Sequence, residues 1–172
     1  SIAKPQLKLT TEMAKPPLNQ PAICLKFSDD RQAKTEVPTA AAPLYLIANQ
    51  PATRLHSQLD FGRNSRDAKV QGREIARMHP DDAAQRSIET GDIVRIFNDR
   101  GSCLASAELT DRIMPRVVEL PTGSWYDPED PGIDGSLEIH GNPNVLTRDK
   151  GSSRLGQGPV AHSCLVDVEL YE

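Results

Sequence analysis

The sequence predicts a small, mainly β barrel. Its apolar runs are short, turn-forming residues separate them, and only one stretch carries a helix-start signal. Apolar runs of about 4–8 residues bounded by turn residues are typical of strands. Several short strands with few helices favour a closed barrel over a layered α/β fold.

Strands are expected wherever apolar residues run together or alternate with polar ones. The first follows Pro43, and the last alternates in the pattern CLVDVEL. Asn98 and Gly101 lie in a turn that joins two of the strands as a β-hairpin. The expected strands are residues 44–48, 74–79, 93–97, 102–109, 117–120 and 164–170.

One short helix is expected at Pro80. Proline suits the first helical turn, and the acidic pair Asp81 and Asp82 favours the positive end of the helix dipole. We expect about two turns, ending near Arg86. Both carboxylates are therefore assigned to the helix terminus and not to acid–base catalysis.

The first 43 residues differ in composition from the rest. All 11 glycines lie at Gly62 or later, whereas six of the 14 prolines lie in residues 1–43. This segment lacks sustained periodicity, apart from a short candidate strand at residues 23–27. Proline removes a backbone donor and disfavours helix in the residue before it. We interpret residues 1–43 as a proline-rich tail or linker from a preceding domain, and residues 44–172 as the barrel.

Composition excludes several classes of protein. The 172 residues suit one domain, and the net charge of −4 argues against a nucleic-acid partner. No apolar run approaches the roughly 20 residues of a membrane span, and we find no signal peptide. Cys24, Cys103 and Cys164 are far apart and odd in number, so we expect small buried apolar side chains.

No autonomous active site emerges from the sequence. The four histidines (His56, His79, His140 and His162) lack metal-ligand spacing, and no nucleophile elbow is present. We therefore predict no catalytic and no metal-ligating residue, and a small self-contained enzyme is a weak alternative.

Three polar stretches are candidates for ligand binding: residues 49–58, 140–144 and 148–157. Loop amides, hydroxyls and arginine suit pyrophosphate. Side-chain amides both donate and accept, so they suit the edge of guanine or a pterin. Structureless stretches as long as residues 121–159 are usually functional or disordered. Ordinary surface loops, and turn chemistry for the asparagines, remain open alternatives. The amides are Asn49, Gln50, Gln58, Asn142, Asn144 and Gln157.

Four motifs, taken together in their order along the chain, point to one protein family. They are RLHSQLD at residues 54–60, GREIARMHPDDAAQRSIETGDIVRIFNDRG at 72–101, GSWYDP at 123–128 and HGNPNVLTRDKGSSRLGQGP at 140–159. Together they resemble the C-terminal molybdopterin-dinucleotide-binding domain of the dimethyl sulfoxide reductase family. The likeness is nearest to its biotin sulfoxide, trimethylamine N-oxide and dimethyl sulfoxide reductase branch, and it covers residues 44–172.

This resemblance implies a double-psi β-barrel with one or two short helices and long loops. It also implies contact with a molybdenum bis(molybdopterin guanine dinucleotide) cofactor. Trp125 and Tyr126 match an aromatic motif near the substrate funnel, while Lys150 and Gly156 depart from the pattern of close relatives. The residues expected to bind the cofactor are Asn49, Thr53, Arg54, Leu55, His56, Ser57, Gln58, His140, Asn142, Asn144, Ser152, Gln157 and His162.

The function implied is that of a cofactor-binding domain within a molybdenum oxidoreductase. Such an enzyme transfers an oxygen atom, here in reducing an S-oxide or N-oxide, and the ligand of the molybdenum comes from another domain. The expected partners are the parent's other domains, and the isolated fragment is not expected to be catalytic or to retain cofactor. Cytoplasm and periplasm both remain open. The alternative is a stand-alone double-psi barrel that acts as a protein-interaction module.

Overall fold

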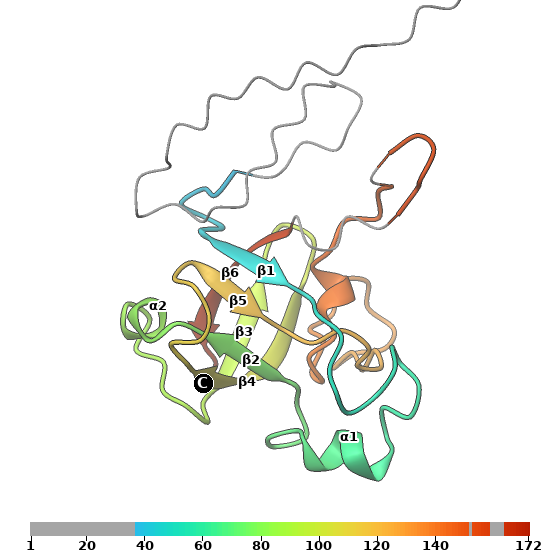
Figure 1. Cartoon of the computed structure of the whole chain (residues 1–172), viewed down its shortest axis with the longest axis horizontal. Coiled ribbons are helices and arrows are strands. Elements are labelled where there is room, and N and C mark those ends of the chain that lie inside the picture. Colours follow the sequence, from blue (N-terminus) through green and yellow to red (C-terminus); the bar gives the residue numbers. More distant parts are fainter. Residues whose placement is uncertain (1–36, 152, 159–163) are drawn as a thin grey trace, which may run out of the picture.

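A computed structural model describes residues 37–151, 153–158 and 164–172 (Figure 1). The candidate strand at 23–27 and most of the predicted tail lie outside these residues. Six strands close into a barrel in the order β1-β5-β2-β4-β3-β6. Two neighbouring pairs run parallel, β1 with β5 and β2 with β4, and the other neighbours are antiparallel. The prediction of a mainly β, double-psi barrel is confirmed.

All six strands expected within the described residues are present, in the order the sequence predicts. The hairpin of β3 and β4 is antiparallel, and it pairs Phe97 with Ser102 across the predicted turn. The strands are β1 (Leu44–Ile47), β2 (Ile75–Met78), β3 (Ile93–Phe97), β4 (Ser102–Leu109), β5 (Val117–Glu119) and β6 (Cys164–Leu170).

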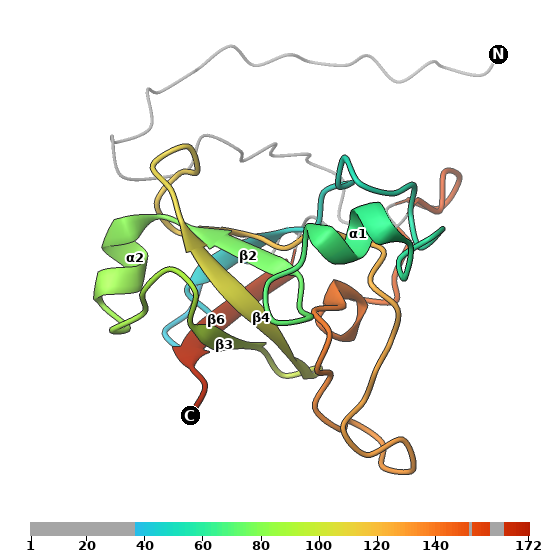
Figure 2. The ribbon, with the colours of Figure 1, turned by 90° about the horizontal axis from the view of Figure 1, so that it is seen from below.

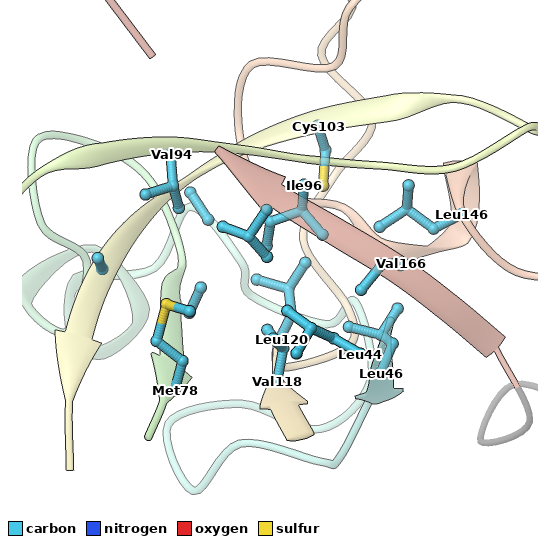
Figure 3. Close-up of a cluster of buried hydrophobic side chains, with 14 of the residues drawn as sticks. Leu44, Leu46, Met78, Val94, Ile96, Cys103, Val118, Leu120, Leu146 and Val166 are labelled. Carbon is cyan, nitrogen blue, oxygen red and sulfur yellow. The ribbon is translucent and has the colours of Figure 1, made fainter. Parts of the chain in front are cut away.

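Alternation along the strands directs one side-chain row into the barrel. Burial alternates residue by residue in β1, β2 and β3, because successive side chains of a strand point to opposite faces. The inward row forms one apolar core, in which Leu46, Ile96 and Val118 are completely buried (Figure 3). Cys103 and Cys164 are buried with it, which confirms the prediction for these two cysteines.

The predicted helix is α2 (Pro80–Ala84). The His79 side chain caps it by accepting a hydrogen bond from the Asp81 N–H, and Asp82 Oδ2 accepts one from the Arg116 N–H at 2.6 Å. Asp81 and Asp82 thus lie in the first turn of the helix, as predicted.

Two further helical turns lie in stretches that were expected to be irregular. One is α1 (Arg63–Asp67), and the other is the 3-10 helix η1 (Pro143–Val145). The Asn142 side chain caps η1 by accepting from the Asn144 N–H. No helix in the described part of the chain is long and apolar enough to cross a membrane.

Strand direction brings the predicted loops to one end of the barrel. Because β1 and β5 are parallel, the segments that follow them leave at the same end. Since β6 is antiparallel to β1, β6 begins at that same end. Figures 1 and 2 show these segments gathered beside α1, with α2 on the opposite side of the molecule. We name three loops there: loop A (residues 48–62), loop B (120–142) and loop C (146–151 and 153–158).

Candidate functional site

Loop A is shaped by the side chain of Gln50. Its amide donates to the Arg54 carbonyl at 2.6 Å, and its carbonyl oxygen accepts from the His56 N–H at 3.0 Å. An isolated β-bridge joins Leu55 to Gln58, and His56 has a positive φ of 49°. This tight turn leaves the side chains of residues 55–58 exposed. Four predicted cofactor-binding residues, Leu55, His56, Ser57 and Gln58, are therefore accessible to a ligand.

Asn49 and Thr53 lie at the base of loop A and are half-buried. The Asn49 amide donates to Glu119 at the end of β5 at 2.9 Å. Its carbonyl oxygen is buried, and no partner for it lies in the described residues. Asn49 thus holds β1 to β5 while keeping an acceptor unpaired.

Arg54 points inward, away from the exposed turn. Its guanidinium lies 2.9 Å from the Glu74 carboxylate and 3.4 Å from that of Asp60, and it donates to the Thr122 carbonyl at 2.9 Å. The side chain is 1% exposed. It therefore ties loop A to loop B, and these buried contacts occupy two of its three nitrogens.

Asp60 contacts both buried cations, Arg54 and Lys69. Lys69 Nζ lies 2.7 Å from one Asp60 oxygen and 3.2 Å from Glu74, so two cations face two carboxylates. Burial raises the pKa of Asp60, but hydrogen bonds from Lys69 and Trp125 and the charges of Lys69 and Arg54 together hold that pKa below its usual value. The carboxylate stays ionised inside the protein.

His140 completes this ionic cluster (Arg54, Asp60, Lys69, Glu74 and His140). Its side chain is 9% exposed, its Nε2 contacts Lys69 Nζ, and its Nδ1 lies 3.2 Å from the Trp125 carbonyl. The structure thus directs the His140 ring into the cluster. The contact with the cofactor that the sequence suggests for His140 stays a prediction.

Loop B contacts loop A through Trp125. The indole Nε1–H donates to the Ser57 carbonyl at 2.7 Å, and the ring lies 5.0 Å from that of Phe61. Gly123 makes this approach feasible, because it has a positive φ of 96° and a Cβ there would overlap the His56 carbonyl oxygen. The aromatic motif and the RLHSQLD motif therefore form one surface.

Glu138 organises the second half of loop B. Its buried carboxylate accepts from the backbone N–H groups of Gly141 and Asn142 at 2.7 Å each, of His140 at 3.0 Å and of Asp127 at 3.3 Å. Burial raises the pKa of Glu138, although these four donors act in the opposite direction. The amides of residues 140–142, which the sequence suggested for pyrophosphate, are thus occupied by an internal carboxylate.

The remaining residues predicted to bind the cofactor differ in their exposure. Asn142 is buried as the cap of η1, whereas Asn144 and Gln157 are exposed. Gln157 has a positive φ of 48°, and its amide donates to the Arg154 carbonyl at 3.2 Å. Ser152 and His162 lie outside the described residues.

This donor set fits a polar organic ligand with heterocyclic and phosphate groups. Exposed hydroxyl and amide side chains come from loop A (Ser57 and Gln58), η1 (Asn144) and loop C (Gln157), and buried Asn49 Oδ1, Arg54 Nε and Ser124 Oγ lack a partner in the described chain. Amides pair with heterocycle edges, and hydroxyls and amides pair with phosphate oxygens. Among the residues that the structure describes, no three His, Cys, Asp or Glu side chains are grouped to hold a metal ion.

Asp60, Lys69, Glu74 and Glu138 were not identified from the sequence as parts of the site. Asp60 closes the quoted RLHSQLD motif, which was the one available signal. A charged residue in a polar stretch is exposed in most proteins, so its burial beside partners distant in sequence gives no local pattern.

Comparison with known proteins shows a family match and several similar proteins. A family model described as "Molydopterin dinucleotide binding domain" matches residues 44–165. Biotin sulfoxide reductase of Cereibacter sphaeroides is 49% identical over 131 residues, which make up 76% of this chain and 17% of that protein. Dimethyl sulfoxide/trimethylamine N-oxide reductase of the same organism is 45% identical over 133 residues, 77% of this chain and 16% of that protein.

Two further similarities agree with these matches. Trimethylamine-N-oxide reductase 1 of Escherichia coli (strain K12) is 46% identical over 130 residues, 75% of this chain and 15% of that protein. The solved structure of acetylene hydratase from Pelobacter acetylenicus superimposes with a TM-score of 0.60 at 18% identity, over 76% of this chain and 18% of that one. The latter likeness shows the fold alone. The chain spans about a sixth of the length of the curated relatives it matches.

Proposed function

Because this chain belongs to the molydopterin dinucleotide binding domain family, we propose that it holds the guanine dinucleotide ends of a bis(molybdopterin guanine dinucleotide) cofactor. The observation that carries the proposal is that loops A, B and C lie at one end of the barrel, with exposed amide and hydroxyl side chains on loop A, loop C and η1. This arrangement offers neutral donors and acceptors to a ligand with guanine and pyrophosphate groups.

Each residue set has a distinct task in this proposal. Ser57, Gln58, Asn144 and Gln157 present exposed groups that pair with the ligand. Arg54 and His140 support the loops from inside the protein, because their side chains make contacts within the ionic cluster. The molybdenum and the pterins supply the two-electron redox chemistry when bound, and this chain supplies orientation and electrostatics.

The whole protein, in this proposal, is a molybdenum oxidoreductase that reduces an S-oxide or N-oxide. The support is that biotin sulfoxide, dimethyl sulfoxide and trimethylamine N-oxide reductases are 45–49% identical to the chain. Residues 1–43 then connect a preceding domain to the barrel at residues 44–172. The ligand of the molybdenum comes from outside this chain.

The remaining domains of the enzyme are the partners in this proposal. Five large apolar side chains at the loop end of the barrel are 50–79% exposed. An apolar patch of this kind is unfavourable in water and marks a surface that another body covers. The same patch is what a stand-alone interaction module would use, so a response to nucleotide separates the two functions. The residues are Leu55, Leu59, Phe61, Trp125 and Tyr126.

Titration with guanosine diphosphate tests the proposal, since this ligand carries the guanine and pyrophosphate groups without the pterin. We expect Gln58→Ala to weaken its binding, while Gln85→Ala does not. Gln85 is also exposed, but it lies at the end of α2, away from the loops. Equal binding by both variants, or none by the native chain, would contradict the proposed function.

A further inference from the structure

The ionic cluster is unusual for its position. None of its five members belongs to a strand, and they join loop A, the segment after α1, the residue before β2 and loop B. Burying charges costs free energy, and a buried ion network seldom stabilises a fold more than apolar packing of the same volume would. The main effect of this cluster is therefore to fix the arrangement of the loops that it joins.

The cluster holds the backbone of Trp125 in place through two contacts. Asp60 Oδ2 accepts from the Trp125 N–H at 2.9 Å, and His140 Nδ1 lies 3.2 Å from the Trp125 carbonyl. The indole of Trp125 in turn donates to the Ser57 carbonyl. The chain of contacts therefore runs from buried charges, through one half-exposed aromatic residue, to the exposed turn of loop A.

The hydrogen-bond directions in this chain are fixed by chemistry. The Lys69 ammonium has only donors, so His140 Nε2 must accept from it. The ring proton of neutral His140 then lies on Nδ1, where it faces the Trp125 carbonyl. Asp60 pairs with the Lys69 ammonium through one oxygen and with Trp125 through the other. One consistent pattern thus satisfies both the N–H and the carbonyl of Trp125.

We propose that Asp60 and His140 are positioning residues, which set Trp125 and loop A in the ligand-binding arrangement before the ligand arrives. This inference rests on the proposed function, because the ligand-contacting residues are those of loop A. In this inference neither side chain touches the ligand, and the positioning role of His140 replaces the direct contact expected from the sequence. Their effect passes through Trp125 to the Ser57 carbonyl, so losing them leaves the binding groups present but incorrectly placed.

The single tryptophan of the chain provides a direct readout of this position. The experiment uses the 172-residue chain and compares Asp60→Asn and His140→Ala with Asp167→Asn as control. Asp167 forms an ion pair with Arg86 at 2.7 Å, just after α2 and away from the loops. For each protein we would measure acrylamide quenching of Trp125 fluorescence, guanosine diphosphate affinity and the thermal unfolding midpoint.

We expect both cluster variants to increase quenching of Trp125 and to weaken guanosine diphosphate binding. The loss of affinity is about tenfold if the loops then adopt the binding arrangement about a tenth of the time. The control should lower the unfolding midpoint without changing quenching or affinity. A purely structural role of the cluster would instead lower the midpoint in all three variants and leave quenching and affinity unchanged, which would overturn the inference.

Two outcomes keep this inference separate from the proposed function. If Asp60→Asn does not fold, His140→Ala decides, because it removes the contact with Trp125 without removing a charged partner from the cluster. If the native chain shows no response to guanosine diphosphate, the proposed function fails. The quenching comparison then still decides whether Asp60 and His140 position Trp125.

Discussion

The Asp60 carboxylate accepts a hydrogen bond from the backbone N–H of Trp125 at 2.9 Å, across 65 residues of sequence. This contact joins the loop that follows β1 to the loop that follows β5. Both strands are parallel neighbours in the barrel, so their loops leave at the same end, and the buried carboxylate fixes how they meet. The two motifs, RLHSQLD and GSWYDP, therefore form one surface at that end.

Acidic pH should weaken the contact between the two loops. The folded-state pKa of Asp60 lies below the usual 3.8, so its ionisation contributes stability that is present above pH 3.8 and is lost as pH falls through the folded-state pKa. We expect the urea midpoint of the native chain to fall with pH in that range, and that of Asp60→Asn to fall less. Equal slopes for the two proteins would show that Asp60 does not carry this linkage.

Glu138→Gln should destabilise the protein although it removes a buried charge. The carboxylate accepts four backbone N–H groups, two on each oxygen, and a glutamine amide nitrogen cannot accept. Each N–H left unpaired in a buried site costs about 1–3 kcal/mol. Chemical unfolding at pH 7 measures the loss, with Glu129→Gln as the exposed control. A variant as stable as the native chain would contradict the role assigned to Glu138.

The burial of Glu138 also predicts a pH effect on stability, opposite in sign to that of Asp60. Its pKa is raised above the usual 4.5, so the folded state holds this proton more tightly than the unfolded state. Its contribution to stability therefore decreases as pH rises from 4.5 through the folded-state pKa. We expect a smaller decrease over that range in Glu138→Gln, measured by urea unfolding at a series of pH values.

Gly123→Ala should separate loops A and B. A Cβ at this position overlaps the His56 carbonyl oxygen, and the φ of 96° is unfavourable for any side chain. Strain of about 1–3 kcal/mol follows from the backbone conformation, with the steric overlap in addition. Gly132→Ala is the matched control, because a Cβ added there would meet nothing within 4 Å and the φ of Gly132 is not positive. Thermal unfolding and Trp125 fluorescence should change in the first variant only.

A cavity in the barrel core should lower the free energy of unfolding by a large amount. Leu46 is fully buried in β1, and Leu46→Ala removes side-chain volume from the apolar core, which costs about 2–5 kcal/mol. Leu155 is 99% exposed in loop C, so Leu155→Ala should change the free energy of unfolding by about 0.5 kcal/mol or less. Similar losses for the two substitutions would contradict the assignment of Leu46 to the core.

Much of the barrel could be predicted from local pattern. The bounds of β3 and β4 follow from apolar runs on either side of the turn at Asn98 and Gly101, and those of β6 follow from its alternation. The helix α1 could not be predicted because its residues, RNSRD, have no apolar stripe and only Ser65 is buried. Helix signals depend on an apolar face, which a short surface helix does not need.

The candidate site was only partly predictable, for a physical reason. The loops were identified by their amides and motifs, and the structure brings them together at one end of the barrel. The orientation of Arg54 and His140 was not predictable, because it depends on Asp60, Lys69 and Glu74, which come close only when the chain folds. Charge burial is a tertiary property, and no local pattern in the sequence reports it.

The central claim is that loops A, B and C form a guanine dinucleotide site. Amide chemical shifts of the 172-residue chain, followed during titration with guanosine diphosphate, test it most directly. We expect the shifted residues to cluster in loops A, B and C and in η1 between loops B and C, including Ser57, Gln58 and Asn144, with α2 unaffected. Shifts confined to α2 and the opposite end of the barrel, or no shifts at all, would contradict the claim.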